Sequence, residues 1–478
     1  MESGVMKSNV SKAVFITLCF LLTSTGWMAW TYNVLSVTSY PVSDHITLVL
    51  GYLFQGAGIG VFSLLCRFRP GIIKDSMYAA LLIHFFTLIP SVLCDSLILI
   101  LICGFALSIS CGYIAGCYLY VLTAGTDSHY RAITLGVGYA AAIFASWCLS
   151  MIGEGKIYYS DSVIIVCLVL TVLTVAIIHS LPQEEKDAAD LENPALPVES
   201  MKSSVSGISP EREESGRIKN ILILTALLIT FFSIVNNCGF AFPSSDIGVE
   251  INVELSRLFY AGGILIAGIV NERGRKYGGI CAVIALIIPF IILSLKSEPV
   301  SANVLWSLSY FAFGFFTVYR LLLFSDLARN LNILYLSGLG LLFGRIGDAA
   351  GEELCLQLSN HFVILLFFSF LVFAASVFLF FGIFNLLYVQ ESPEPKHEES
   401  LVKFNRFSRQ YSLSIREREV LRCLLEEKSN IEIADVLSVS ESTVKYHIHN
   451  LLKKTGCRNR VSLIASYFAG TDAEKKEN

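Results

Sequence analysis

The sequence predicts an all-α protein: a polytopic membrane bundle of twelve helices, arranged as six plus six, followed by a small four-helix domain at the C-terminus. Two observations carry this prediction. First, 54% of the 478 residues are hydrophobic and only 15% are charged, against about 25% charged in a typical soluble protein. Second, apolar runs of about 20 residues recur through most of the chain and then stop, and the remaining chain turns amphipathic.

Twelve apolar runs approach the length needed to cross a hydrocarbon core about 30 Å thick. The first begins near Ala13 and is too long for a cleavable signal segment, so we expect it to remain as the first span. The expected spans of the first set are 13–37, 46–66, 77–94, 96–122, 131–152 and 162–181, and those of the second set are 218–241, 255–270, 279–295, 301–324, 333–358 and 361–389.

Polar stretches divide the chain further. A Glu-, Ser- and Pro-rich stretch separates the two sets of spans and is unable to form a core, so we expect a cytoplasmic loop there. The expected divisions are a first membrane half at 1–181, the polar loop at 182–217, a second membrane half at 218–390, a solvated linker at 391–412, the C-terminal domain at 413–470 and a polar tail at 471–478.

Basic residues in the short loops predict the orientation, because cytoplasmic loops are enriched in Lys and Arg. The opposite side of a twelve-span arrangement carries little beyond Lys156 and Lys296, and its loop after the seventh span holds Asp246 and Glu250. Both termini are therefore expected in the cytoplasm. The basic residues that share the cytoplasmic side are Lys7, Lys12, Arg67, Arg69, Lys74, Arg131, Arg273, Arg275, Lys276 and Arg329.

The 13 cysteines are scattered through apolar segments, and no pair has the C-x-x-C spacing. We expect them to behave as small hydrophobic residues, with no disulfide, no metal site and no cofactor. No motif of an enzyme active site stands out, so enzymatic activity is not expected.

Helix start signals recur in the C-terminal region. Ser414 and Glu417 fit a capping box, in which each side chain accepts a bond from an unpaired backbone N–H at the start of a helix. Asn430 is expected to cap a second helix at 431–437, and Ser440 to cap a third. The short turn between the second and third helices predicts a helix-turn-helix.

The third helix has two faces of different character. No Asp or Glu occurs from Ser442 through Thr471, so the outer face is basic. A tight turn followed by a helix with a basic face is the arrangement that places a recognition helix in the major groove of DNA. The expected inward residues are Val444, Ile448, Leu451 and Leu452, and the expected outward residues are Lys445, Tyr446, His449 and Lys453.

Four stretches of this domain resemble, in order, the LuxR-type (NarL/FixJ) helix-turn-helix of bacterial transcription regulators. They are SIREREVLR from Ser414, SNIEIADVL from Ser429, VSESTVKYH from Val439 and KTGCRNR from Lys454. The resemblance implies that Lys445, Tyr446 and His449 contact base edges of double-stranded DNA. It also implies that Thr443 and Lys453 contact phosphates.

The resemblance further implies a fourth helix, near 460–468, that forms a homodimer contact on two-fold DNA sites. Lys428 departs from the family, which usually has a Gly there, so the first helix is expected to end differently. The alternative interpretation is a helical bundle whose basic face only touches anionic lipid or solvent. The spacing of the turn favours DNA binding.

Two sets of six spans, a polar central loop and cytoplasmic termini resemble the plan of the major facilitator superfamily. The sequence NERGRK at 271–276, between spans 8 and 9, resembles the family's Asp-Arg-x-Gly-Arg-Arg motif. The loop between spans 2 and 3 has only RFRPG at 67–71, which argues against active transport more than against the fold.

Ionisable residues at membrane depth are costly and indicate function by default. Arg320 in span 10 and His84 in span 3 are possible members of a ligand site with span 11, which holds Arg345, Asp348, Glu352 and Glu353. A second interpretation stays open, in which Arg345 and Asp348 only neutralise each other. For His84 a satisfied core histidine is the favoured interpretation.

These features together predict a one-component transcription regulator in the bacterial cytoplasmic membrane. In this interpretation a small-molecule ligand binds the helical bundle, which is surrounded by membrane lipid, and alters pairing of the tethered domains on DNA. The alternatives are a secondary transporter with a fused regulatory DNA-binding domain, and a plain membrane anchor for a constitutive one.

Overall fold

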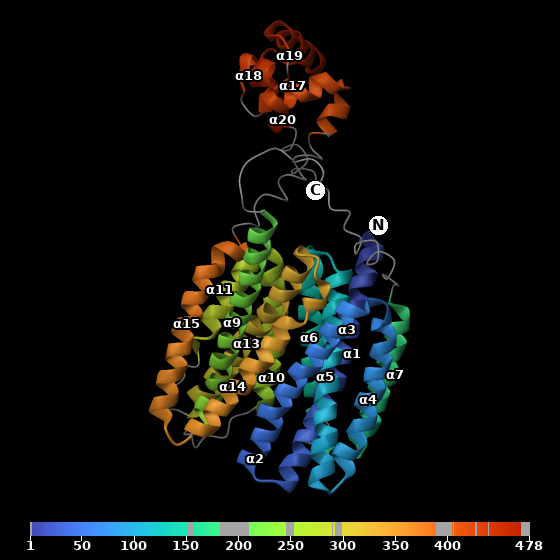
Figure 1. Cartoon of the computed structure of the whole chain (residues 1–478), viewed down its shortest axis with the longest axis vertical. Helices are drawn as coiled ribbons and strands as arrows, with labels where there is room; N and C mark the ends of the chain where they lie inside the picture. Colours follow the sequence, from blue (N-terminus) through green and yellow to red (C-terminus); the bar gives the residue numbers. More distant parts are fainter. Residues whose placement is uncertain are drawn as a thin grey trace. The chain divides into compact units, whose positions relative to one another are not determined.

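The computed structural model divides the chain into two compact units, Met1–Leu386 and Leu387–Asn478, each described by itself (Figure 1). Several expectations lie outside the described residues: most of the polar loop, Asp246, Glu250, Lys296, most of the linker and the tail. The described residues are 2–151, 156–159, 161–181, 210–244, 253–288, 290, 291, 299–388, 404, 406–425, 428–437 and 439–469.

The described helices of the membrane unit form two sets of six, as the apolar runs predict. The first set consists of α1 (Glu2–Val37), the continuous run of α2 (Tyr40–Asp44), η1 (His45–Leu50) and α3 (Gly51–Phe68), then α4 (Ile73–Leu93), α5 (Leu97–Gly125), α6 (Ser128–Met151) and α7 (Ser162–Ser180). The second set consists of α9 (Pro210–Ser244), α10 (Val253–Arg273), α11 (Arg275–Ala285), α13 (Pro299–Asn330), α14 (Leu339–Leu358) and α15 (Phe362–Tyr388).

Nine of the described helices are long and apolar enough to cross a membrane, which makes the chain a multi-pass membrane protein. α10, α11 and α14 are not among the nine. α14 is 20 residues long and carries four charged residues, Arg345, Asp348, Glu352 and Glu353. It therefore depends on neighbouring helices to shield these charges from lipid. It also begins later than the expected position 333, because the short turn η4 (Leu334–Leu336) precedes it.

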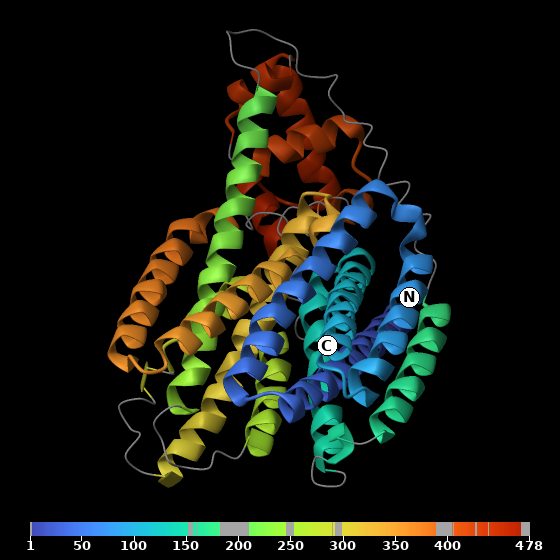
Figure 2. The ribbon, with the colours of Figure 1, turned by 60° about the horizontal axis from the view of Figure 1, so that its bottom comes forward.

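The two sets form two groups of helices that lie side by side, blue to teal for the first and green to orange for the second (Figures 1 and 2). α6 packs along α10, and α3 packs along α14, so these pairs join the two halves. The hydrophobic core of the first half extends across this boundary to Ile264 and Ala267 of α10.

Glycines permit close helix crossings in both halves. A Cβ atom at Gly112 of α5 would lie 1.8 Å from the Gln55 carbonyl oxygen, and one at Gly340 of α14 would lie 2.1 Å from the Arg320 carbonyl oxygen. Both distances are far below van der Waals contact, so no side chain fits at either crossing. The G-x-x-x-G spacings in α5 and α14 therefore serve helix packing.

The C-terminal unit contains α17 (Ile415–Leu425), α18 (Asn430–Leu437), α19 (Glu441–Thr455) and α20 (Arg460–Ala469). Its core is extended by residues that were expected in the solvated linker. Phe404 and Phe407 are buried in this core, and the Phe407 ring lies 5.3 Å from that of Tyr467. The linker expectation is wrong from residue 404 onward, because these aromatic side chains find an apolar surface on the folded domain.

Side-chain caps begin all four of these helices; at α20, Asn459 Oδ1 accepts the Ser462 N–H at 2.8 Å. Ser414 N–H donates to Glu417 at 2.7 Å and Glu417 N–H donates to Ser414 Oγ at 3.3 Å, which is the predicted capping box. Ser440 Oγ caps α19 as predicted. The expectation of Asn430 as a cap is wrong. Ser429 forms a second capping box with Glu432, at 2.7 and 3.4 Å, so Asn430 is already helical.

Candidate functional site

The buried residues of α19 determine how the helix is rotated about its own axis. Val444 and Leu451 are fully buried in the core of the C-terminal unit. This burial leaves the opposite face of the helix to solvent. Four of the five residues predicted to bind DNA are exposed there: Lys445, Tyr446, His449 and Lys453. The fifth, Thr443, is half-buried, and its Oγ1 lies 2.8 Å from Ser440 Oγ at the cap.

The two lysines nearest the ends of this helix are bound differently. Lys445 pairs with Glu441 one turn away at 2.8 Å, and both side chains are well exposed, so the ion pair is weak and easily exchanged. Lys454, in contrast, donates to the buried Glu417 at 2.7 Å and to the Ser412 carbonyl oxygen at 3.1 Å. Lys454 thus joins the end of α19 to the start of α17.

Glu417 is the acidic centre of this second contact. Burial raises the pKa of its carboxyl group, but hydrogen bonds from Lys454 and Ser414 outweigh burial, and the net pKa lies below its usual value of 4.5. The carboxylate therefore stays ionised at neutral pH and holds α19 near its C-terminal end.

A second cluster of functional candidates lies inside the membrane unit. Arg320 of α13 and Arg345 of α14 both donate through Nη1 to Asp348, at 3.2 Å to the same carboxylate oxygen. Glu352 lies one turn further along α14 and accepts a hydrogen bond from Asn237 of α9 at 3.0 Å. Four of the five residues predicted to line a ligand site are therefore neighbours in space.

His84 does not join this cluster. Its ring is fully buried in the first half, with Nδ1 3.0 Å from Ser110 Oγ and 3.8 Å from Cys111 Sγ. A Cβ atom at Gly26 of α1 would lie 3.0 Å from its Nε2. The ring thus fills the contact among α1, α4 and α5, as expected for a core histidine, but its buried Nε2 has no hydrogen-bond partner among the described residues, so the ring is only partly satisfied.

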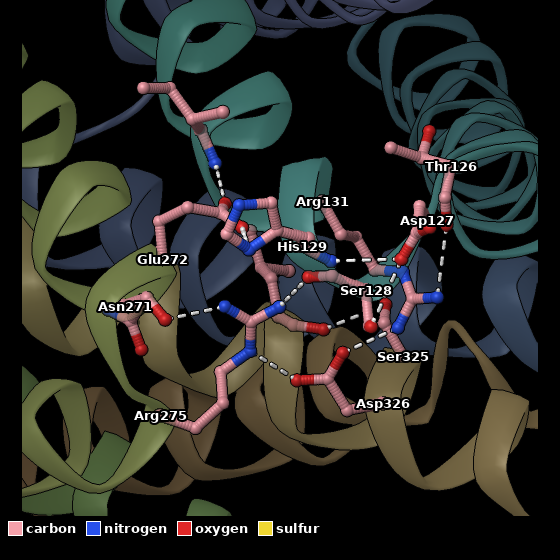
Figure 3. A network of polar contacts seen from close by, with 12 residues as sticks. Thr126, Asp127, Ser128, His129, Arg131, Asn271, Glu272, Arg275, Ser325 and Asp326 are labelled. Carbon is pink, nitrogen blue, oxygen red and sulfur yellow. Dashed lines mark hydrogen bonds and ion pairs between the residues drawn. The ribbon is translucent and has the colours of Figure 1, made fainter. Parts of the chain in front are cut away.

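A third polar network joins the two halves, and we call Arg131, Glu272, Arg275 and Asp326 the inter-half clamp (Figure 3). Asp326 of α13 accepts from Arg131 of α6 at 2.5 Å and from Arg275 of α11 at 2.6 Å. Arg275 also donates to the Ser128 carbonyl oxygen at 2.8 Å. One carboxylate of the second half therefore holds an arginine from each half.

The clamp has a second contact through Glu272, which accepts the backbone N–H of Ile133 at 2.9 Å. Arg131 is 1% exposed and Asp326 is 17% exposed, so these charges are largely removed from solvent. Nearby, Arg329 donates to the Ala124 carbonyl oxygen at 3.1 Å. The same end of the bundle is thus held by several bonds from the second half to the first.

Asp326 was not among the residues predicted from the sequence, and Arg131 and Arg275 were predicted only to lie on the cytoplasmic side. A usable signal was present. Asp326 is an isolated carboxylate just beyond the apolar run 301–324, and basic loops were expected at the same end. What was missing is the pairing, because Arg131 and Asp326 are 195 residues apart.

A family model described as "Bacterial regulatory proteins, luxR family" matches residues 411–467. The chain is 43% identical over 60 residues to the regulatory protein SdiA of Escherichia coli, covering 13% of this chain and 25% of that protein. It is 52% identical over 50 residues to the nitrate/nitrite response regulator NarP of E. coli, covering 10% and 23%. The chain thus spans about a quarter of the length of these relatives. It is 41% identical over 59 residues to the spore germination protein GerE of Bacillus subtilis, covering 12% of this chain and 80% of GerE.

Solved structures resemble the membrane unit in fold. The peptide transporter POT in complex with sulfate has a TM-score of 0.54 at 12% identity, over 80% of this chain and 95% of that chain. The proton:xylose symporter XylE, of the major facilitator superfamily, has a TM-score of 0.55 at 13% identity, over 81% and 97%. The chain therefore combines a membrane bundle of the major-facilitator fold with a C-terminal helix-turn-helix domain, through which it belongs to the luxR family of bacterial regulatory proteins.

Proposed function

We propose that this chain is a membrane-bound one-component transcription regulator, in which the helical bundle binds a small molecule and the C-terminal domain binds specific DNA. The observation that carries the proposal is the exposed basic face of α19 in a luxR-family domain that follows a major-facilitator bundle in one chain. When the ligand-binding domain and the DNA-binding domain belong to one polypeptide, no separate signalling protein is needed between them.

The DNA contacts follow from the rotation of α19. Lys445, Tyr446 and His449 reach base edges in the major groove, where direct readout takes place. Lys453 and Thr443 bind phosphates and hold the helix in register. We propose that α20 provides a homodimer contact on two-fold sites, since tethering to one membrane raises the local concentration of the domains.

The bundle acts as the sensor in this proposal. A ligand shifts an equilibrium between two arrangements only if it binds one of them more tightly. The inter-half clamp is a contact that one arrangement keeps and the other breaks, because Asp326 belongs to one half and Arg131 to the other. We place the bundle in the bacterial cytoplasmic membrane with both termini in the cytoplasm, where the DNA is.

We propose sensing in preference to transport. Arg275, at the start of α11, belongs to the clamp, whereas the segment between α3 and α4, where the family's loop motif is expected, has only RFRPG at 67–71. This incomplete motif argues against active transport. Uptake of a solute into proteoliposomes that follows a proton or sodium gradient would favour a transporter instead.

The proposal is tested by replacing Lys445 and His449 with Ala in the full-length chain and mapping the DNA that it occupies in cells. Loss of occupancy at the cognate promoter is expected, with unchanged insertion into the membrane. Arg416→Ala is the matched control, because it removes an exposed basic residue of α17 rather than α19. Unchanged occupancy in the double variant would refute the assignment of α19.

A further inference from the structure

We propose that Arg320 and Arg345 bind the carboxylate of a small organic monoanion, at the boundary between the two halves of the bundle. This inference rests on the proposed sensory function and names the chemical class of the ligand.

The two arginines are incompletely used by the protein. Asp348 receives only the Nη1 atom of each, at 3.2 to 3.3 Å, whereas good charge-assisted N–H···O bonds are about 2.7–2.9 Å long. The bonds of Asp326 in the clamp, at 2.5 and 2.6 Å, show that this bundle does form tight arginine pairs elsewhere. Asp348 therefore holds its two arginines more loosely than Asp326 holds its own pair.

Each guanidinium retains an unpaired donor. The Nε atoms of Arg320 and Arg345 are buried and have no hydrogen-bond partner, and Arg320 as a whole is only 8% exposed. A buried donor on a charged group is costly when left unpaired. The Nε–H and the adjacent Nη2–H point the same way in a guanidinium, and this edge matches the two oxygens of a carboxylate.

The arginines meet few acceptors in spite of the carboxylates nearby. Both guanidinium groups share the single carboxylate of Asp348. Glu352, one turn further along α14, is hydrogen-bonded by the neutral amide of Asn237 at 3.0 Å, and this bond leaves its negative charge in place. The unused donor edges of Arg320 and Arg345, rather than a net positive charge, therefore favour a carboxylate ligand.

Aromatic rings border both arginines. The Arg345 guanidinium carbon lies 4.6 Å from the centre of the Tyr52 ring, and that of Arg320 lies 5.1 Å from the Phe316 ring. Tyr52 belongs to α3 of the first half and stacks on Trp27. These rings favour an anion with an apolar body over a hydrated inorganic ion. Because Tyr52 and Arg320 come from different halves, a ligand between them bridges the halves.

Binding is tested with the purified full-length chain in lipid nanodiscs, using calorimetric titration with benzoate and acetate and with the uncharged benzamide and acetamide. Saturable binding of at least one carboxylate, and none of its amide, is expected. Arg345→Gln should weaken that binding about tenfold or more, the loss expected for a charge-assisted hydrogen bond. Equal binding of amide and carboxylate, or displacement of benzoate by equimolar chloride, overturns the proposal.

Asp348→Asn is the decisive second variant, because a purely structural ion-pair cluster and a carboxylate site predict opposite results. Removal of the competing carboxylate should tighten benzoate binding if the arginines form an anion site. Loss of binding in an Asp348→Asn protein that remains monodisperse overturns the proposal. Arg345→Lys keeps the positive charge but loses the two parallel N–H donors of the guanidinium. This variant should weaken benzoate binding to an intermediate degree, and it remains a test if Arg345→Gln fails to fold.

DNA affinity measured in the same preparations separates this inference from the proposed function. Carboxylate binding that leaves DNA affinity unchanged supports the anion site and contradicts sensing. DNA binding that responds to an uncharged compound, with no carboxylate bound, contradicts the anion site and leaves the sensory function standing.

Discussion

The membrane bundle and the C-terminal domain use ion pairs of similar length in different surroundings. Arg131 and Asp326 lie 2.5 Å apart with 1% and 17% of their side chains exposed. Arg416 and Glu419 lie 2.8 Å apart with 59% and 39% exposed. Distance alone therefore says little about what an ion pair contributes. Burial decides it, because a charge that loses its partner inside the bundle is not rehydrated by water.

The bundle also contains pairs of long sequence separation, beside the local Arg345–Asp348 pair of α14. In the bundle, Asp326 pairs with a residue 195 positions away, and Arg320 with one 28 positions away. On the surface of the C-terminal domain, Arg416–Glu419 and Lys445–Glu441 are pairs within one turn of a helix. The long-range pairs of the bundle thus specify how helices pack, whereas Lys445 on α19, whose pair is exposed, remains available to a partner.

Removal of the clamp carboxylate is the largest test of this contrast. Asp326→Ala leaves Arg131 and Arg275 without their shared partner and should lower the free energy of unfolding by about 3–5 kcal/mol. Thermal unfolding in detergent measures the effect. Glu419→Ala is the control and should cost less than about 1 kcal/mol. Equal effects of the two variants would break the comparison.

Glu417 is the exception in the C-terminal domain, since it is a buried partner there. Glu417→Gln should destabilise this domain by about 1–2 kcal/mol at neutral pH, less than for a fully buried pair because Lys454 is 38% exposed. Its pKa is lower in the folded than in the unfolded chain, so its stabilisation is present above pH 4.5 and is lost as the pH falls below that value.

Acid titration of domain unfolding checks this prediction. The original chain should lose stability more steeply than the Glu417→Gln variant as the pH falls through 4.5 toward the lowered pKa. Parallel curves would mean that the contact of Glu417 with Lys454 does not make the stability of the domain depend on pH.

The cap of the recognition helix is the next smaller test. Ser440→Ala removes the acceptor for the Thr443 N–H and should cost about 1 kcal/mol. Faster hydrogen exchange in the first turn of α19 is expected, with the amides of α17 unchanged. Exchange that increases equally in both helices would indicate global destabilisation rather than loss of a cap.

The smallest effect on stability is expected at Glu441. Glu441→Gln removes the exposed partner of Lys445 and should change the free energy of unfolding by less than about 1 kcal/mol. Affinity for DNA should nevertheless rise at low salt. In the variant, Lys445 no longer has to break its ion pair with Glu441 before it contacts DNA. A variant with unchanged DNA affinity at all salt concentrations would place Lys445 outside the interface.

The amino-acid sequence alone was sufficient for the features that depend on neighbours along the chain. Runs of apolar residues predicted the two sets of six helices, and the Ser414–Glu417 capping box and the Ser440 cap predicted where helices of the C-terminal domain begin. These signals are local, because helix period and capping involve residues at most four positions apart. Even so, Ser429 competed with Asn430 as a cap, and only the backbone geometry decided between them.

Only the tertiary structure decided which distant residues meet. It showed that Asp326 pairs with Arg131 and that Arg320 pairs with Asp348. It also showed that His84 lies in the first half beside Ser110, apart from the Asp348 cluster. It also brought Phe407 from the expected linker into the core beside Tyr467. The physical reason is that burial and ion pairing depend on distances through space, which are set by the packing of whole helices and are not encoded in the spacing of any one segment.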